Sequence, residues 1–459
     1  MHDLLEKTFH LKKHQTNVKT EILAGVTTFM TMAYILAVNP SILSASGMDS
    51  GAIFTATALS SCLATLMMAF FSNYPFALAP GMGLNAFFAY TVVGQMGYSW
   101  QVALGAVFIE GLIFILLSVT NVREAIFNCI PASLKMGITC GIGLFIAFIG
   151  LQNAKLVVDS STLVSIYPFH NSLVNGTFSP EGVGALLAFI GILITAVLIC
   201  KKVPGGILLG IFCTWFLGII CQLTGIYQPA PELGMGSVLP DFSTGLHVPS
   251  LAPTFLKMDF SGILSLNVLT IMLSFLFVDL FDTMGTLIGV ASKADMLDEN
   301  GNLPRIRGAL LSDAIGTSLG AILGTSTVSS YVESSSGVMA GGRTGLTSVV
   351  TALLFALSLF LSPIFLAIPS FATAPAMIIV GFMMLEMVVR IDFSDMTEAI
   401  PAFITIIAMP FMYSISEGIA LGVISYVVIQ VAAGKAKEKK IHWIIYALAI
   451  AFILKYIFV

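Results

Sequence analysis

Long runs of apolar residues are the feature that most restricts how this chain can fold. Of its 459 residues, 57% are hydrophobic and 10% are charged. A helix of roughly 20 apolar residues crosses the hydrocarbon core of a bilayer. In water, a protein of this composition would expose large apolar patches. The sequence therefore predicts an all-α membrane protein with many transmembrane helices.

About fourteen apolar runs are long enough to span the membrane. They lie at 21–44, 51–72, 76–95, 101–121, 130–152, 181–200, 204–226, 264–291, 306–323, 327–343, 346–367, 372–390, 398–414 and 416–433. A further apolar stretch, 441–459, follows a basic linker and could be one more span or an interfacial helix.

The basic residues support this count. If residues 1–20 are cytoplasmic, alternating spans leave only Lys155 and Lys257 as basic residues outside, as the positive-inside rule expects. The inner set comprises Arg123, Lys201, Lys202, Lys293, Arg305, Arg307, Arg343, Arg390 and the run 435–440. We therefore predict a multi-pass protein of the cytoplasmic membrane, taken as a bacterial inner membrane, with a cytoplasmic N-terminus.

The spans divide into two sets of seven. Residues 21–226 hold the first set and 263–433 the second, with an extracellular connector at 227–262 and a tail at 434–459. An odd number of spans per set makes the two sets opposite in orientation, so they are predicted to be inverted repeats.

The third and tenth spans each begin with a stretch that does not favour a helix. The third begins YPFALAPGMGLN at Tyr74, and the tenth begins GTSTVSSYVESSSG at Gly324. Lipid cannot satisfy irregular backbone, so these segments must line a cavity enclosed by protein. Interrupted segments at matching places in inverted repeats indicate the binding site of a transporter.

Acidic residues are rare inside the spans and are therefore candidates for function. Each buried charge costs roughly 2.5–3.5 kcal/mol on insertion scales. Asp279 and Asp282 lie in the eighth span, Glu333 in the tenth and Glu110 in the fourth. We interpret Glu110 as a polar contact between helices or a residue at the membrane interface, and for Asp279 a ligand cavity and a structural role stay open. Asp279, Asp282, Thr283 and Thr286 are predicted to lie on or near one helix face, which should point at the cavity.

Glu333 is predicted to stand at the N-terminus of a half-helix, where a serine- and threonine-rich run offers caps. Free backbone N–H groups there, and Asn85 with the nearby glycines on the opposite half-helix, could bind a polar ligand. Such a cavity suits a small planar molecule with alternating donors and acceptors. All six histidines lie outside the spans, so buried carboxylates would have to carry any transported proton. No metal or other cofactor is predicted, and the net charge of −4 gives no indication of nucleic-acid binding.

Four stretches make the chain similar to the AzgA-like branch of the nucleobase permeases, within the xanthine/uracil/vitamin C permease group. They are AGVTTFMTMAYILAVNP (Ala24–Pro40), APGMGLNAFFAYTV (Ala79–Val92), DLFDTMGTLIGVA (Asp279–Ala291) and TSTVSSYVESSSGVMAGGRTGLTSVV (Thr325–Val350). The resemblance implies fourteen helices in two inverted seven-helix repeats, split into a core domain and a gate domain. It also implies uptake of purines such as guanine, hypoxanthine or adenine together with protons. Relatives of this fold often dimerise, so a homodimer joins the purine, protons and membrane lipids as an expected partner.

The resemblance also implies roles for individual residues. Asp282 and Glu333 stand where uracil-type members have glutamates that contact the base. Thr286 replaces a histidine of those members, which favours Asp282, with Asp279 as helper, for proton coupling beside Glu333. Short strands near 76–79 and 327–331 are expected to touch the base. The substrate-binding set expected in this way is Asp282, Glu333, Asp279, Thr286, Asn85, Phe76, Ala77, Tyr331, Ser334, Thr31 and Tyr34.

Two alternatives remain at this point. The same fold could carry uracil, xanthine or an anion, although acids at both key positions would repel an anion. The Asp279–Asp282 pair also matches the DxxD motif with which magnesium-dependent prenyl transferases bind diphosphate. Those enzymes need two acid-rich motifs near a membrane surface, whereas this chain has one in the middle of a span. An enzyme is therefore not predicted.

Overall fold

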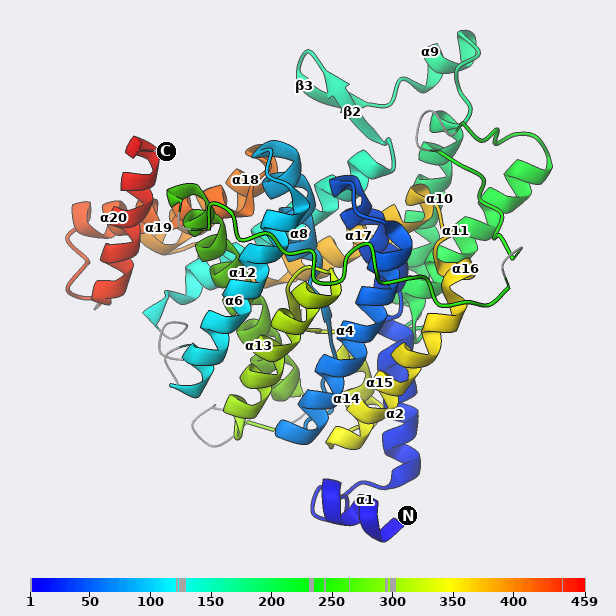
Figure 1. The fold of residues 1–459 in the computed structure, drawn as a ribbon. Coiled ribbons are helices and arrows are strands. Elements are labelled where there is room, and N and C mark those ends of the chain that lie inside the picture. The colour runs from blue at the N-terminus through cyan, green and yellow to red at the C-terminus, as the bar shows by residue number, and fades with distance from the viewer. Residues whose placement is uncertain are drawn as a thin grey trace.

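Helices form most of the protein (Figure 1). The computed structural model describes residues 2–120, 123, 129–230, 235–242, 245–263, 265–293, 296–297, 303–439 and 441–458. In these ranges, eleven helices are long and apolar enough to cross a membrane. The predicted all-α membrane fold is therefore confirmed.

The first half contains the elements up to residue 223. They are α1 (His2–Phe9), α2 (Val18–Met32), α3 (Ile35–Leu43), η1 (Ser44–Ser46), α4 (Ser50–Phe71), β1 (Leu78–Pro80), α5 (Met82–Ala86), the π-helix η2 (Phe87–Gln95), α6 (Trp100–Val119), α8 (Ala132–Asn153), β2 (Val157–Ser160), β3 (Leu163–Ile166), α9 (Phe169–Val174), α10 (Glu181–Cys200) and α11 (Gly206–Leu223).

The second half begins with the longest of the described helices. Its elements are α12 (Leu266–Lys293), α13 (Ile306–Leu323), β4 (Val328–Ser330), α14 (Ser334–Met339), α15 (Gly345–Ser358), η4 (Leu359–Leu361), α16 (Ser362–Phe365), α17 (Ser370–Leu385), η5 (Glu386–Arg390), α18 (Met396–Phe411), α19 (Ile415–Ala432) and α20 (Trp443–Phe458).

The two interrupted spans occur where the sequence predicted them. The third is β1 followed by α5 and η2, and the tenth is β4 followed by α14. Pro80 ends β1, and proline cannot continue a strand ladder as a donor. The short strands and half-helices are therefore present in both halves.

Helix packing divides the spans into two groups. The core group comprises α2 to α6 and α12 to α15, in which α4 packs on both α13 and α15, and α6 packs on α13. The gate group comprises α8, α10, α11, α17, α18 and α19, in which α8 packs on α17 and α18. Two of these contacts join the halves in equivalent ways, because α4 of the first half packs on α15 of the second, and α13 of the second packs on α6 of the first, as inverted repeats require.

One close backbone approach in the gate group joins a helix from each half. A Cβ added to Gly143 of α8 would lie 2.6 Å from the carbonyl oxygen of Gly381, and one added to Gly381 of α17 would lie 2.3 Å from that of Gly143. Small residues let membrane helices approach backbone to backbone. Gly143 and Gly381 therefore let α8 and α17 pack backbone to backbone at this point.

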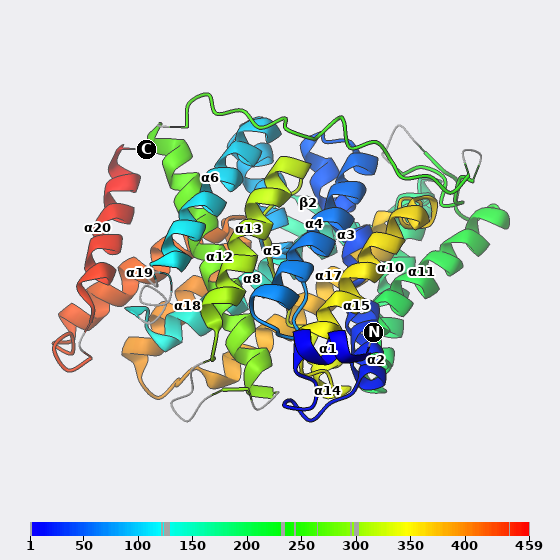
Figure 2. The same cartoon turned by 60° about the horizontal axis from the view of Figure 1, so that its bottom comes forward.

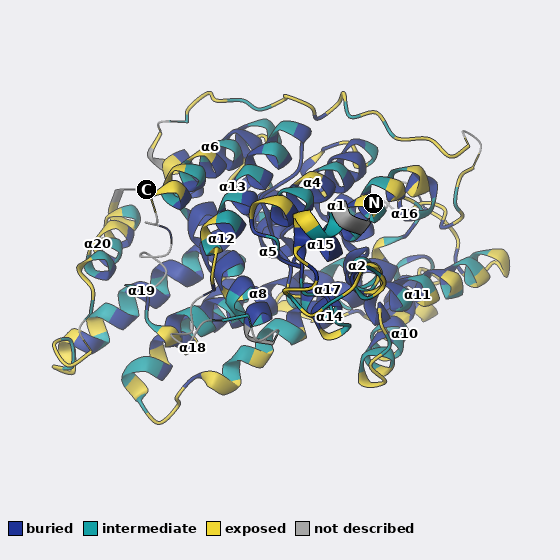
Figure 3. Cartoon of the chain, turned by 90° about the horizontal axis from the view of Figure 1, so that it is seen from below, coloured by how far each residue is buried: buried dark blue, intermediate teal, exposed yellow. Residues whose placement is uncertain are grey.

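The termini and connectors lie at the periphery. In Figure 2 the extended segment before α12 runs along the edge of the molecule opposite to α1. α20 packs against α19, where Lys455 and Tyr456 both hydrogen-bond Glu417. Figure 3 shows that exposed residues gather on the outer helices, whereas the centre is buried. The apolar stretch after the basic linker is therefore a helix attached to the gate group.

Gly381→Ala is expected to destabilise the protein, because the new methyl group would collide with the backbone of α8. Overpacking of this kind costs about 1–3 kcal/mol. Gly289→Ala on α12 is the matched control, since nothing lies within 4 Å of its added Cβ. Thermal unfolding of the purified protein in detergent measures both. An unfolding temperature of Gly381→Ala equal to that of Gly289→Ala would contradict the close contact.

Candidate functional site

The two interrupted spans meet through their strands. β1 and β4 pair antiparallel, with Leu78 opposite Ser330 and Pro80 opposite Val328. The ladder extends beyond the strands, because Gly81 N donates to the Thr327 carbonyl at 3.0 Å and Tyr331 N donates to the Ala77 carbonyl at 3.0 Å. The irregular backbone of each span is thus satisfied by the other.

Glu333 lies where β4 gives way to α14, and it is buried. The Tyr34 hydroxyl donates to Glu333 Oε1 at 2.5 Å, and Thr31 Oγ1 donates to the Glu333 carbonyl at 3.4 Å. Tyr34 occupies the break between α2 and α3. The predicted residues Thr31, Tyr34 and Glu333 are therefore brought together.

Asp282 approaches the same strands from α12. Ser329 Oγ donates to Asp282 Oδ2 at 2.8 Å. A Cβ added to Gly81 would lie 2.8 Å from Ser329 Oγ and 3.3 Å from Asp282 Oδ2, so this position has no room for a larger side chain. The lack of a Cβ at Gly81 thus allows the carboxylate to reach the strand pair.

The two carboxyl groups share one electrostatic neighbourhood. Asp282 interacts with Glu333, and Tyr34 and Tyr331 each interact with both acids. The Tyr331 hydroxyl donates to the Pro80 carbonyl at 2.5 Å, which fixes that ring against β1. We call Asp282, Glu333, Tyr34 and Tyr331 the acidic site.

One face of α12 near the acidic site is open. Asp282 and Thr286 are partly exposed. Nothing lies within 4 Å of a Cβ added to Gly285 or Gly289. An open strip therefore leads from Asp282 towards the C-terminal end of α12, and Thr286 lies on this strip.

The remaining predicted residues support the strands. Ala77 N donates to Ser334 Oγ at 3.0 Å. The Phe76 ring stacks on Tyr74 with centroids 5.1 Å apart. Asn85 Oδ1 accepts a hydrogen bond from Ser326, while its Nδ2 is buried and has no partner among the described residues. Asn85 therefore retains a side-chain donor that no described residue uses.

The free amides expected at the start of α14 are not free. Ser334 N, Ser335 N and Ser336 N donate to the carbonyls of Tyr331, Val332 and Glu333 at 2.9–3.1 Å. No side chain caps this helix. That part of the sequence prediction is wrong, because a tight turn of successive i to i+3 bonds precedes α14 and uses its first donors.

Asp279 faces a different set of partners from Asp282. Arg123 Nη2 lies 3.4 Å from Asp279 Oδ2 and 2.7 Å from Asp313 Oδ2. Thr283 Oγ1 lies 3.0 Å from Asp279 Oδ1 and 2.6 Å from Asp313 Oδ1. All four side chains are buried, and we call Arg123, Asp279, Thr283 and Asp313 the ion cluster. The expectation that Asp279, Asp282, Thr283 and Thr286 all face one cavity is therefore wrong.

Arg123 was expected in an inner loop, but it is fully buried and packs 3.9 Å above the Phe114 ring. Basic residues near span ends usually lie in loops, and the charge rule cannot recognise one that turns inward. Asp313 is a further buried acid that was not predicted, although an acid inside the apolar run 306–323 is itself a signal. Ser329 was not predicted either, because the serine-rich run gives no reason to select that residue.

Glu110 is buried and bonds to the strand region. Thr327 Oγ1 donates to Glu110 Oε2 at 2.8 Å, and Oε1 has no partner among the described residues. The interpretation of Glu110 as a contact between spans agrees with this bond. In the described part of the chain, no group of three or more His, Cys, Asp or Glu side chains could hold a metal ion.

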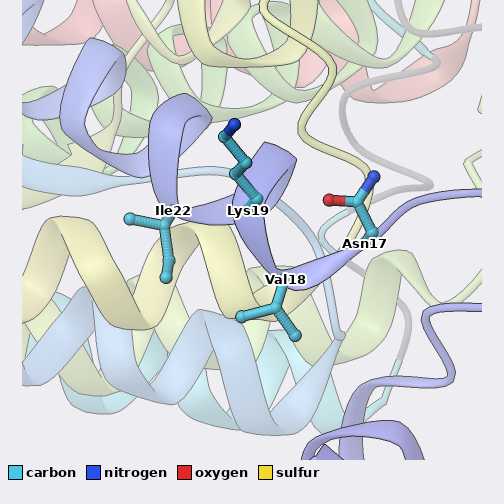
Figure 4. Close-up of a pocket in the computed structure, with 4 residues that line it drawn as sticks. All are labelled: Asn17, Val18, Lys19 and Ile22. Carbon is cyan, nitrogen blue, oxygen red and sulfur yellow. The ribbon is translucent and has the colours of Figure 1, made fainter.

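A shallow depression lies elsewhere, at the start of α2. Asn17, Val18, Lys19 and Ile22 line it (Figure 4). The Asn17 side chain is used locally, because it accepts a hydrogen bond from Thr20 N. None of the residues that line this depression belongs to the acidic site, and we assign the depression no part in binding.

The fold and the site together define an integral membrane transporter. The paired strands between two half-helices, set in inverted repeats, are the arrangement expected for alternating access. The transmembrane domain of a cyanobacterial bicarbonate transporter, BicA, has the same fold, with a TM-score of 0.62 at 17% identity over 90% of this chain and 96% of that one.

The sequence comparison then identifies the family. A family model described as Permease family matches residues 19–453, and this chain belongs to that family. It is 45% identical to the guanine/hypoxanthine permease PbuG of Bacillus subtilis, over 98% of this chain and 99% of that one. It is 43% identical to the adenine permease AdeP of Escherichia coli, over 99% and 96%. The predicted family is confirmed, and the protein is a multi-pass permease rather than an enzyme.

Tyr34→Phe is expected to lower the free energy of unfolding by about 1–3 kcal/mol, because it removes the hydroxyl that donates to the buried Glu333 carboxyl. The loss should be smaller in the Glu333→Gln background, since the amide supplies its own donor. Thermal unfolding of the wild type, the two single variants and the double variant measures the coupling. Additive losses in the double variant would show that the two side chains do not interact.

Proposed function

We propose that this permease takes up purine nucleobases, guanine or hypoxanthine and adenine, together with protons. The observation that carries the proposal is the meeting of Asp282 and Glu333 at the paired strands. The names of the relatives from Bacillus subtilis and Escherichia coli support a purine as the cargo.

The acidic site has the hydrogen-bonding groups that a purine requires. Carboxyl groups accept from ring N–H and exocyclic amino groups, and the hydroxyls of Tyr34, Tyr331 and Ser329 can donate to ring nitrogens or a carbonyl oxygen. A purine would exchange its bonds to water for these bonds, and a site built for such bonds rejects molecules that lack them. Thr286 and Asn85 extend this set along α12 and α5.

The proposal includes a movement of the core group against the gate group. The acidic site lies wholly on core-group elements, and the open strip on α12 begins at Asp282. Moving the core group would carry the site across the membrane while the gate group stays in place. The core group and the gate group each take helices from both repeats. The repeats are proposed to be 21–226 and 263–433, with the outer connector 227–262 between them.

The proposed setting is the cytoplasmic membrane of a bacterium, with residues 1–20 in the cytoplasm and lipid around the outer helices. The apolar side chains exposed on α10, α11 and α18, among them Phe189, Phe216 and Phe403, suit contact with lipid or with a second copy. We therefore include a homodimer in the proposal, and no cofactor besides the proton gradient.

Glu333→Gln is expected to abolish purine binding, because the carboxyl acceptor at the start of α14 is lost. A thermal-shift assay with hypoxanthine, guanine and adenine measures binding, since a ligand that binds the folded state raises the unfolding temperature. Glu181→Gln is the matched control, because that partly exposed side chain pairs with Lys155, which lies just after α8 and outside the acidic site. Full stabilisation of Glu333→Gln by purines would remove Glu333 from the site.

Purified protein in liposomes should accumulate labelled hypoxanthine or guanine when the outside is acidified. Uptake that ignores the pH gradient would show that protons are not coupled. A competition panel of purines, uracil, xanthine, bicarbonate and sulfate identifies the cargo class. Competition by the anions alone would replace the purine proposal with anion transport. The observation in favour of anion transport is the fold shared with the bicarbonate transporter.

A further inference from the structure

The ion cluster lies beside the acidic site but contains different residues. It joins three parts of the core group, since Arg123 follows α6, Asp279 and Thr283 belong to α12, and Asp313 belongs to α13. Thr283 follows Asp282 directly in α12, so one turn of this helix contributes to both the ion cluster and the acidic site. All of its side chains are fully buried.

The geometry at Thr283 indicates how many protons the cluster holds. Its hydroxyl oxygen is 3.0 Å from Asp279 Oδ1 and 2.6 Å from Asp313 Oδ1. A hydroxyl has one proton to donate, so the second contact is a hydrogen bond only if that carboxyl is itself the donor. One hydroxyl proton shared by two carboxylates beside a single guanidinium would leave buried negative charge uncompensated, which is costly. One of the two carboxyls therefore carries a proton.

The charge balance agrees with this proton count. Arg123 is the one cation that contacts Asp279 and Asp313 within the described residues. With one proton on the pair the cluster has no net charge, and without it the net charge is −1. A neutral cluster is cheaper to bury in the protein than a charged one.

A proton carrier must be stabilised both with and without its proton, and the Asp279–Asp313 pair meets this requirement. Arg123 compensates the ionised form, and Thr283 bonds the protonated one. Glu110 also faces the cluster electrostatically, but its described hydrogen bond is to the Thr327 hydroxyl, its other oxygen has no described partner, and it forms no ion pair with Arg123 among the described residues. Asp282 and Glu333 bond the hydroxyls of Ser329 and Tyr34, and neither forms an ion pair with a described cation.

We propose that the Asp279–Asp313 pair, with Arg123 as its fixed counter-ion, binds the proton that travels with the cargo, an inference that rests on the proposed function. The pair takes up one proton from the side to which the site is open and releases it on the other side. No electrons move, and the net charge of the cluster changes from −1 to zero and back. Thr283 links the pair to the cargo site, because it follows Asp282 directly in α12 and contacts both carboxyls of the pair.

The dependence of hypoxanthine affinity on pH tests this assignment on the purified full-length protein. If one proton must be bound together with the base, the affinity of the wild type for hypoxanthine should fall about tenfold for each pH unit above the pH at which the pair loses its proton. Asp313→Asn mimics the protonated carboxyl and leaves Asp279 to pair with Arg123. This variant should bind hypoxanthine with an affinity that no longer changes with pH. Asp279→Asn should behave in the same way and serves as the test if Asp313→Asn does not fold.

Three further variants separate the proton site from general effects. Ser312→Ala removes a buried hydroxyl on α13 whose described hydrogen bond, at 2.8 Å to the Gly308 carbonyl, lies within its own helix. This variant should keep the wild-type slope, that is, the change of hypoxanthine affinity with pH. Glu110→Gln should keep it as well. Thr283→Val retains both carboxyls and should shift the pH at which the slope begins.

The outcomes are distinct. An unchanged slope in both aspartate variants, or loss of the slope in Glu110→Gln alone, overturns the assignment. A wild type that binds hypoxanthine equally at every pH also overturns it, while leaving purine binding intact. A wild type that binds none of hypoxanthine, guanine and adenine instead refutes the proposed function itself.

Discussion

The backbone pairing of β1 with β4 is the interaction on which the rest of the core group depends. Inside a bilayer there is no water to satisfy an unpaired N–H or carbonyl group, so a broken span is tolerated only where protein supplies the partners. Each of the two broken spans supplies them for the other, from Ala77 and Tyr331 at one end of the ladder to Gly81 and Thr327 at the other. The acidic site then becomes available beside the ladder, because Asp282 of α12 and Tyr34 from the break after α2 reach it.

The buried acids of the core group differ in what compensates them. Asp282 and Glu333 are bonded by the hydroxyls of Ser329 and Tyr34, which a polar ligand can replace at small cost. Asp279 and Asp313 are bonded by a guanidinium and a shared hydroxyl, which no neutral ligand would displace. The first arrangement suits reversible binding of an uncharged base, whereas the second suits a group that stays inside the protein and changes only its protonation.

Much of the fold could be predicted from the sequence, because span length and interrupted helices are local properties. Pro75, Pro80 and the serine-rich run before Glu333 mark the broken spans without reference to the rest of the chain. The partners across the core group could not be predicted in this way. Ser329 is one of several serines in its segment, and Arg123 follows a span in the manner of a loop residue, so their roles depend on which helices happen to pack together. The short turn before α14, which uses the amides expected to be free, is likewise a tertiary outcome.

The position of the ion cluster has a consequence for coupling. Asp279, Asp282 and Thr283 lie within about one turn of α12, and helix geometry keeps their backbones rigidly related. A cargo that alters the Asp282 contact with Ser329 can therefore alter the Thr283 contact with Asp279 and Asp313 without any long-range rearrangement. Coupling through one turn of a helix requires only that both sites bias the same local element. This arrangement allows proton and cargo to bind at separate groups and still cross the membrane together, because both are carried by the same moving part of the protein.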